Sequence, residues 1–191
     1  LTVVIMAILS IFLTAMTVAR EWENGSMELL LSTPVEPFEI VAGKAAPYAA
    51  LGAVAVAFVY AIARVGFGVP FVGSLWTFGL GCLLFLATYL AQGLLISATT
   101  RQQTIAMQLS MLTGMLPSNL LSGFVFPIAS MPKFFWYFTM LLPARWFMEI
   151  ARRTFLEGST LSQLAVPFSA LAASCALMTW LTARSFRRSL E

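Results

Sequence analysis

The sequence predicts an all-α, polytopic membrane protein, with five transmembrane helices, a short coupling helix on the cytoplasmic surface and a re-entrant helix pair on the outer side. Hydrophobic residues make up 60% of the 191 residues and charged residues only 10%, against about 45–50% and 25% in soluble domains. Five uncharged apolar runs are long enough for a helix to cross the hydrocarbon, which takes about 20 residues. A soluble core could not absorb so many apolar helices.

Charge marks where each expected span ends. Arg20, Arg64, Arg101 and Arg184 follow the first, second, third and fifth runs, and a charge at the bilayer centre costs about 2.5–3.5 kcal/mol on insertion scales. The whole chain, 1–191, is therefore expected to form one transmembrane domain. Its spans are expected at residues 1–18, 45–63, 75–100, 105–126 and 165–183.

Acidic residues gather between the first two spans, where residues 20–39 hold five of the eight in the chain. Residues 20–33 are expected to form a short amphipathic helix, with Met27 and residues 29–31 opposite an acidic side. Helices on lipid surfaces are usually basic on their polar face, and an anionic leaflet would repel an acidic one. We expect these acids to face a basic protein partner; a solvated face without a partner is the alternative.

The connection 127–158 is not an ordinary loop. Lys133 precedes an aromatic, apolar run that ends before Pro143, too short to span the bilayer and suited to a re-entrant or interfacial helix. Its Trp and Tyr residues fit the headgroup level. Arg145, Glu149 and Arg153 then follow at i, i+4 spacing, which predicts a charged stripe on a short helix.

Orientation follows from the basic tail at Arg184, Arg187 and Arg188, because clustered Lys and Arg mark a cytoplasmic end and meet anionic lipid. Five crossings then place the first residues outside. The segment 20–44 and the loop at Arg101 lie inside, and the connection 127–160 lies outside.

Catalytic chemistry is missing from the sequence. The chain has no His and no Asp, and it shows no nucleophile–base pair, phosphate-binding loop or metal cluster. We expect no enzyme activity, no cofactor in this chain and no nucleic-acid partner. Proton-coupled transport normally leaves an acid or His within the spans, and these spans have none. Their neutral polar residues are interhelical hydrogen-bonding groups or line a pathway, and the candidates for lining are Gln92, Gln108, Thr113 and Asn119.

Two motifs carry a family resemblance. Residues 20–34 read R-E-W-E-N-G-S-M-E-L-L-L-S-T-P, which is similar to the R-E-x-E-x-G-[ST]-[LM]-E-x-L-L-x-[TS]-P segment of ABC-2 type permeases, the membrane subunits of one class of ABC exporters. Residues 122–132 read S-G-F-V-F-P-I-A-S-M-P and resemble the outer S-G-F-x-F-P-x-x-x-M-P turn of that family. Trp22 departs from the basic residue often found at its position.

The resemblance implies an inner-membrane permease subunit that pairs with a second permease, as a homodimer or heterodimer. Two cytoplasmic ATPase subunits would bind it and would carry the ATP and Mg. The subgroup that fits best has a large extracytoplasmic domain between its first and second helices, so residues 1–18 would correspond to the second helix. A secondary transporter or channel without an ATPase is the alternative, as is a membrane scaffold.

The same resemblance implies two groups of functional residues. The ATPase-coupling group comprises Glu21, Glu23, Gly25, Glu28, Leu30, Thr33, Pro34 and Arg101, and the outer gate comprises Gly123, Phe126, Pro127, Met131 and Pro132.

Overall fold

The computed structural model describes residues 2–25, 37–123, 125–126 and 131–188, and in these ranges the protein is all-α. Two short π-helical turns interrupt the α-helices. In chain order the elements are α1 (Thr2–Glu23), α3 (Pro37–Ala61), the π-turn η1 (Ile62–Gly66), α4 (Leu75–Thr100), α5 (Gln103–Ser110), the π-turn η2 (Met111–Met115), α6 (Leu116–Leu120), α7 (Lys133–Met140), α8 (Pro143–Leu156) and α9 (Ala165–Arg188).

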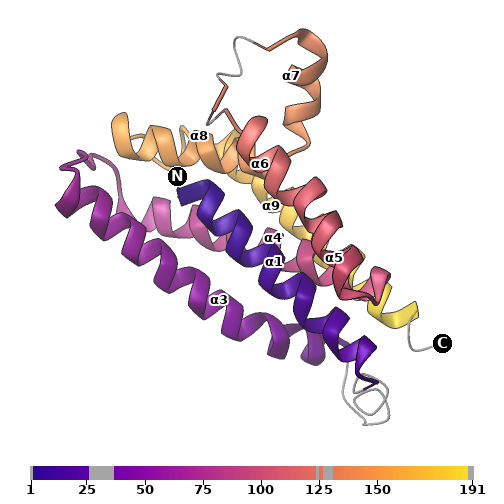
Figure 1. Cartoon of the computed structure of the whole chain (residues 1–191). Helices are drawn as coiled ribbons and strands as arrows, with labels where there is room; N and C mark the ends of the chain where they lie inside the picture. The colour runs from indigo at the N-terminus through magenta and orange to yellow at the C-terminus, as the bar shows by residue number, and fades with distance from the viewer. Residues whose placement is uncertain (1, 26–36, 124, 127–130, 189–191) are drawn as a thin grey trace.

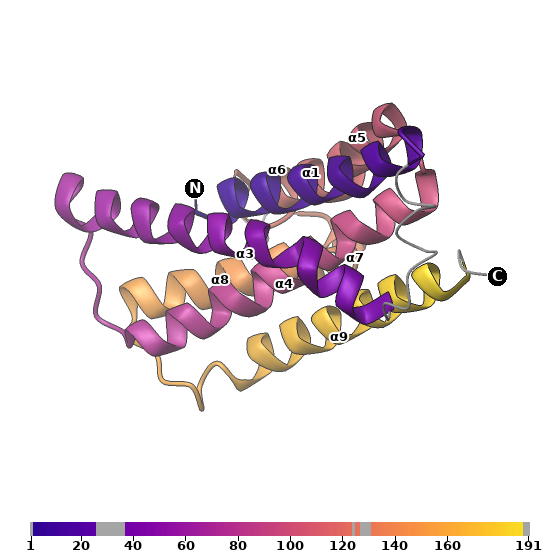
Figure 2. The ribbon, with the colours of Figure 1, turned by 90° about the horizontal axis from the view of Figure 1, so that it is seen from below.

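The long helices run up and down one bundle, and the two chain ends lie at its opposite ends (Figures 1 and 2). One end holds the last turn of α1, the turn between α4 and α5, and the end of α9; we call it the hinge end. The other holds α7 and α8, and we call it the aromatic end. Among the described residues, four helices are long and apolar enough to cross a membrane: Val3–Glu23, Ala42–Gly66, Leu75–Thr100 and Ala165–Ser185.

Two helices at the hinge end extend beyond the predicted spans. The first helix does not stop at residue 18 but continues to Glu23, so residues 20–23 form its last turn rather than the start of a separate helix. Two residues after its end, Gly25 has a φ of 70°, in the left-handed region that glycine adopts without a steric penalty. The second helix is already formed at Pro37, not 45. The rest of the predicted coupling helix, with Glu28, Leu30, Thr33 and Pro34, lies outside the described residues.

The helix expected over 105–126 is formed over residues 103–120, as α5, η2 and α6 in succession. It ends earlier than expected, and Gly123 at φ 88° turns the chain. The π-turn has a local cause in Pro117, which has no N–H to donate to the Thr113 carbonyl four residues earlier. Gln92 of α4 donates its side-chain amide to that carbonyl instead, at 3.4 Å. Neighbouring helices commonly satisfy backbone groups that a proline frees in this way.

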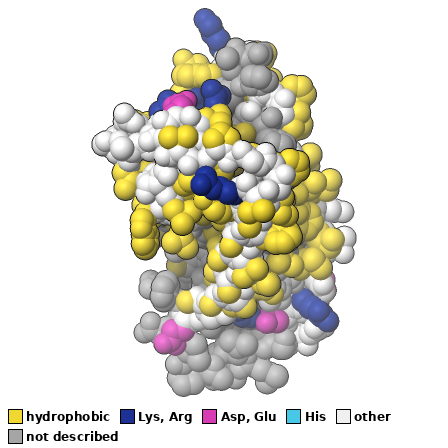
Figure 3. All heavy atoms as spheres, turned by 90° about the vertical axis from the view of Figure 1, so that its left-hand side faces the viewer, with side chains coloured by type: hydrophobic (Ala, Val, Ile, Leu, Met, Phe, Trp, Pro, Cys, Tyr) yellow, Lys and Arg dark blue, Asp and Glu magenta, His cyan; other side chains and the backbone are white. Residues whose placement is uncertain are grey.

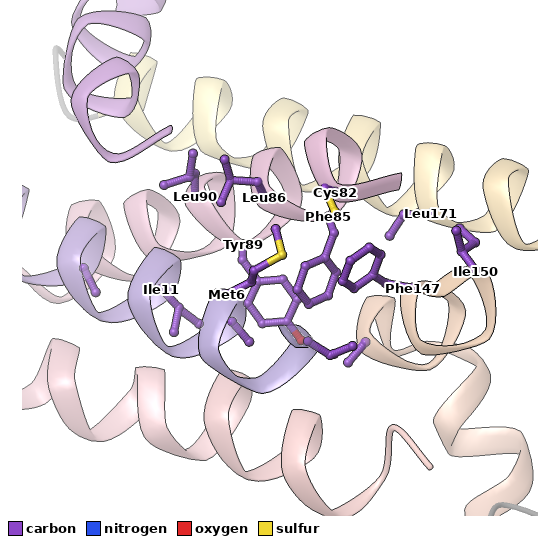
Figure 4. Close-up of a cluster of buried hydrophobic side chains, with 14 of the residues drawn as sticks. Met6, Ile11, Cys82, Phe85, Leu86, Tyr89, Leu90, Phe147, Ile150 and Leu171 are labelled. Carbon is purple, nitrogen blue, oxygen red and sulfur yellow. The ribbon is translucent and has the colours of Figure 1, made fainter. Parts of the chain in front are cut away.

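Helix α4 lies at the centre of the bundle and packs closely against α1. Phe85 stacks on Phe147 of α8 with ring centroids 4.3 Å apart, and Tyr89 lies 4.6 Å from Phe85 (Figure 4). Near the middle of the contact, a Cβ on Gly93 would lie 2.0 Å from the Thr14 hydroxyl. Such close backbone approach through small residues is typical of helix packing in membranes, where apolar lipid supplies no hydrophobic drive for association.

The helix formed by α5, η2 and α6 packs on α1 in the same manner. Its buried positions follow one another at four-residue spacing and are all small: Ala106, Ser110, Gly114 and Ser118. A Cβ on Gly114 would lie 2.3 Å from a methyl carbon of Ile11, so the backbone of this helix lies directly on the side chains of α1.

Candidate functional site

The last turn of α1 carries the acidic residues predicted to contact an ATPase, and the structure turns two of them toward the protein itself. Glu21 forms an ion pair with Lys44 of α3. The Lys44 side chain is only 12% exposed and that of Glu21 30%. This ion pair links the last turn of α1 to the first half of α3, which is helical from Pro37 onward.

Glu23 reaches the start of α5, far along the sequence. Its Oε1 accepts a hydrogen bond from the backbone N–H of Gln103 at 2.8 Å, and its Oε2 accepts one from the Gln103 side-chain amide. Gln102, at the N-cap position, forms no side-chain cap bond. The first N–H groups of a helix have no partner within it, and the helix dipole favours an anion there. Glu23 therefore caps α5 from another helix.

Arg101 occupies the turn between α4 and α5. Its φ of 53° is left-handed, and its N–H caps α4 by donating to the Ser97 carbonyl at 3.2 Å. Its guanidinium carbon lies 4.1 Å from the ring centroid of Trp22, which is cation–π geometry. Trp22, which departs from the family motif, thus offers an aromatic face to a cation at this position.

The ATPase-coupling group is therefore only partly visible. Glu21, Glu23 and Arg101 are brought together at the hinge end, each with a partner inside the chain, and Gly25 is exposed in the turn after α1. The remaining four members lie outside the described residues. A coupling role for the group stays a prediction.

Buried hydroxyl groups link the helices in the middle of the bundle, and sequence reasoning missed them. The Ser97 hydroxyl accepts from the N–H of Ala19 and donates to the carbonyl of Ala15, both at 2.5 Å, so it lies within the α1 hydrogen-bond ladder. Tyr89 pairs with Ser118 at 2.6 Å, and Thr182 of α9 donates to the Ala91 carbonyl at 2.8 Å. The four-residue spacing of Gly93 and Ser97 was the available signal, because small residues at this spacing mark a helix contact.

The four candidate lining residues do not form one cluster. Gln92 and Thr113 meet through the amide-to-carbonyl bond described above. Gln108 and Thr113 are exposed on the helix of α5, η2 and α6, and Asn119 is half-buried near its end. The exposed side of this helix thus combines neutral polar groups with methionines and leucines, among them Met107, Met111 and Leu112.

The predicted outer gate lies at the aromatic end. Gly123 forms its positive-φ turn, Phe126 is 55% exposed, and Pro132 is the residue before α7. Met131 is half-buried, whereas Pro127 falls outside the described residues. Helix α7 stands away from the bundle and exposes most of its aromatic side chains (Figure 1).

Arg145 of α8 holds α7 in place. Its guanidinium donates to the Trp136 carbonyl at 2.8 Å and to the Thr139 hydroxyl at 2.6 Å. Its carbon lies 5.2 and 5.4 Å from the rings of Trp136 and Trp146. Trp146 in turn donates to the Met140 carbonyl at 2.8 Å. These donors satisfy carbonyls at the C-terminal end of α7, where the helix dipole favours a cation.

Part of the predicted charged stripe is confirmed. Arg153 pairs with Glu149 at 3.0 Å, whereas Arg145 turns to α7. Partial burial lowers the pKa of Arg145 from its ordinary value, and the Glu149 carboxylate opposes this shift. Arginine titrates so far above neutrality that the guanidinium remains charged.

The surface agrees with a membrane setting. Figure 3 shows a face covered largely by hydrophobic side chains, with few charged groups. Two apolar grooves flank α3. One, of about 560 Å³, lies against the first half of α1 at Ile5 and Leu9, and the other, of about 370 Å³, lies against α4 at Leu83 and Leu86.

Comparison with known proteins gives a consistent picture. The family model described as "ABC-2 family transporter protein" matches residues 1–184. The chain is 39% identical over 188 residues to the probable multidrug ABC transporter permease YbhS of Escherichia coli K12, which covers 98% of this chain and 50% of that protein. It is 33% identical over 150 residues to the probable multidrug ABC transporter permease YbhR of the same organism, covering 78% and 40%.

A third relative, the inner membrane transport permease YhhJ of Escherichia coli K12, is 30% identical over 153 residues, covering 79% of this chain and 40% of that protein. The chain thus spans about half the length of the curated relatives it matches. With the helical bundle, the matched motifs and a family model that matches nearly every residue, the chain is a multi-pass membrane protein that belongs to the ABC-2 family of transporter proteins.

Proposed function

We propose that this chain forms the membrane domain of the permease of an ATP-driven exporter in the inner membrane. Hydrolysis of ATP would take place on separate ATPase subunits, and a second permease would complete the pathway. Family membership supports this proposal, as does the likeness to two different permeases of one organism. The single observation that carries it is made at the hinge end. There the first residues of the motif that the family resemblance assigns to ATPase coupling form the last turn of α1, and two of their acids contact other helices.

In this proposal the chain crosses the membrane five times, with α5, η2 and α6 as the fourth crossing, so that residue 2 lies outside and α9 ends inside. Helices α7 and α8 form the outer re-entrant pair. The opposite positions of the two chain ends support an odd number of crossings (Figure 1). Cysteines placed at Ser26, Ser159 and Ser189 test it, because only the one at Ser159 should react with an impermeant reagent added outside intact cells.

A large extracytoplasmic domain, between a first helix and α1, would lie in the part of the protein that precedes this chain. The relatives are at least about twice as long as the segment that they share with this chain, which leaves room for such a domain outside it. Limited proteolysis of the full-length protein in right-side-out vesicles should release a soluble fragment from that region. Failure to release any such fragment would contradict it.

The cargo we propose is hydrophobic or amphipathic. The spans carry neutral polar residues, the grooves beside α3 are lined by apolar side chains, and two relatives are described as probable multidrug transporters. Such surfaces receive apolar molecules without burying an unpaired charge.

The decisive experiment is co-expression of the full-length permease with candidate ATPase and permease partners, followed by purification and flux measurements in proteoliposomes. We expect the ATPase to co-purify and an apolar dye to move only when ATP is hydrolysed. Flux without an ATPase would instead identify a secondary transporter or channel. Co-purification with no flux of any cargo would favour a scaffold.

A further inference from the structure

We infer that Glu23 is a positioning residue that joins the hinge to α5, rather than a residue whose carboxylate binds the ATPase. The last turn of α1 and the turn between α4 and α5 then move as one body. The structural part of this inference stands on contacts within the chain. Its consequence for transport rests on the proposed function.

The connection is made at two adjacent positions of α1. Trp22 lies under the Arg101 guanidinium, and the Glu23 carboxylate accepts hydrogen bonds from the backbone N–H and the side-chain amide of Gln103. Only Arg101 and Gln102 separate α4 from α5. The two α1 residues therefore hold the short turn on both sides, and the end of α1 cannot shift without breaking these contacts or carrying the turn with it.

The same turn of α1 shows that the acids have divided roles. Glu21 pairs with Lys44 of α3, whereas Glu23, two residues later, caps α5. One acid thus links α1 to the helix that follows the hinge, and the other links it to a helix 80 residues away in sequence. Both carboxylates are thus engaged by groups within this chain, and Glu23 is engaged in this way while it remains exposed.

Movement at the cap would be passed along α5. The small residues Ala106, Ser110 and Gly114 keep the backbone of this helix against α1, so the capped end and the packed face belong to the same pair of helices. The opposite side carries Gln108 and Thr113, two of the candidate lining residues. A displacement of the last turn of α1 would therefore reach the lining side through Glu23.

Amide hydrogen exchange of the full-length permease in nanodiscs tests the cap without any partner. The variant Glu23→Ala should speed exchange of the first amides of α5, residues 103–106, by about tenfold, which is the usual consequence of losing a cap. Glu23→Gln should have a smaller effect, because its amide oxygen still accepts a bond. Glu21→Gln is the matched control, and exchange in α5 should be unchanged there.

A second variant removes the donor instead of the acceptor. Gln103 is the first residue of α5, where proline is well tolerated, and Gln102 before it is extended, at φ −134° and ψ 128°, as a residue before proline must be. Gln103→Pro therefore deletes both donors while leaving α1 untouched. In the co-purified complex, Glu23→Ala and Gln103→Pro should each retain the ATPase and its hydrolysis but lower ATP-driven flux, and combining them should add no further loss.

Other results would overturn the inference. Unchanged exchange of residues 103–106 in Glu23→Ala would show that no cap exists. Loss of ATPase co-purification in Glu23→Ala, with full retention in Gln103→Pro, would show that the carboxylate binds the partner directly. If the unmodified permease retains no ATPase at all, the proposed function fails, whereas the exchange result still decides whether Glu23 caps α5.

Discussion

Helices α1 and α7 are both apolar, yet the protein holds them in opposite ways. Helix α1 packs against α3, α4 and α5, and its last turn is fixed by an ion pair, a helix cap and a cation–π contact. Helix α7 lies against α8 and is held at its C-terminal end by Arg145 and Trp146. The position of α1 is thus fixed by several helices, whereas the described contacts of α7 are concentrated at its C-terminal end.

The largest expected effect comes from crowding the α1–α4 contact. Gly93→Ala places a methyl carbon 2.0 Å from the Thr14 hydroxyl and 2.7 Å from the Ile11 carbonyl oxygen, and backbone cannot move aside cheaply. Overpacking of this kind costs about 1–3 kcal/mol. Thermal unfolding in detergent should show a clear loss of stability. Gly79→Ala on the same helix is the control, since a Cβ there meets no atom within 4 Å; equal losses in both variants would mean that α1 is not packed as described.

Removing Arg145 should release α7 while sparing α1. Arg145→Ala deletes the bonds to the Trp136 carbonyl and the Thr139 hydroxyl. A hydrogen bond to a charged group contributes about 1.5–3 kcal/mol, and we expect less from these two because they are exposed or only partly buried. Hydrogen exchange or proteolysis of residues 133–141 should accelerate several-fold, with unchanged protection in α1. Arg153→Ala, which breaks the pair with Glu149, is the matched control. Loss of protection throughout the bundle would remove the distinction between the two helices.

Ser97→Ala should have a modest effect. It removes the hydroxyl that bridges the Ala15 carbonyl and the Ala19 N–H, but these two groups are four residues apart and can then bond directly, as in any α-helix. We expect a loss of about 1 kcal/mol or less in the free energy of unfolding. Thr99→Ala, which removes a bond within α4 itself, serves for comparison. A loss as large as that of Gly93→Ala would show that α1 depends on the bridge.

The smallest effect belongs to the Glu21–Lys44 pair. Partly exposed ion pairs contribute about 0.2–1 kcal/mol. A double-mutant cycle with Glu21→Gln and Lys44→Met should therefore yield a coupling energy within that range, measured from unfolding in detergent. A coupling energy near zero would mean that the ion pair adds nothing measurable to the cap and the cation–π contact at the last turn of α1.

Much of the fold could be predicted from the sequence, because long uncharged runs permit little except membrane helices. The runs at 75–100 and 165–183 reappear almost unchanged in α4 and α9. Helix ends were harder to place. Lys44 suggested a boundary, but lysine is a good helix former, and α3 begins at Pro37. The pairing of Lys44 with Glu21 is a contact between segments, which cannot be recognised from local composition.

The coupling role of the motif at residues 20–34 stays a prediction, and the contacts that its described part makes could not be predicted from the sequence. The partner of Glu23 is the start of α5, which no pattern within the motif could indicate. Pro117, by contrast, offered a readable signal for the π-turn before it, because a proline inside a helix always leaves a carbonyl without its usual donor.

The arginine–tryptophan contacts give the protein its own optical reporters. Trp22 lies under Arg101 at the hinge end, and Trp136 and Trp146 flank Arg145 at the aromatic end. Indole fluorescence responds to a nearby cation and to the polarity around the ring. Two versions of the protein that retain only one of these groups, with all other tryptophans replaced, would therefore emit from opposite ends of the bundle. Time-resolved fluorescence of these two versions would show whether the two ends of the bundle move together or one after the other.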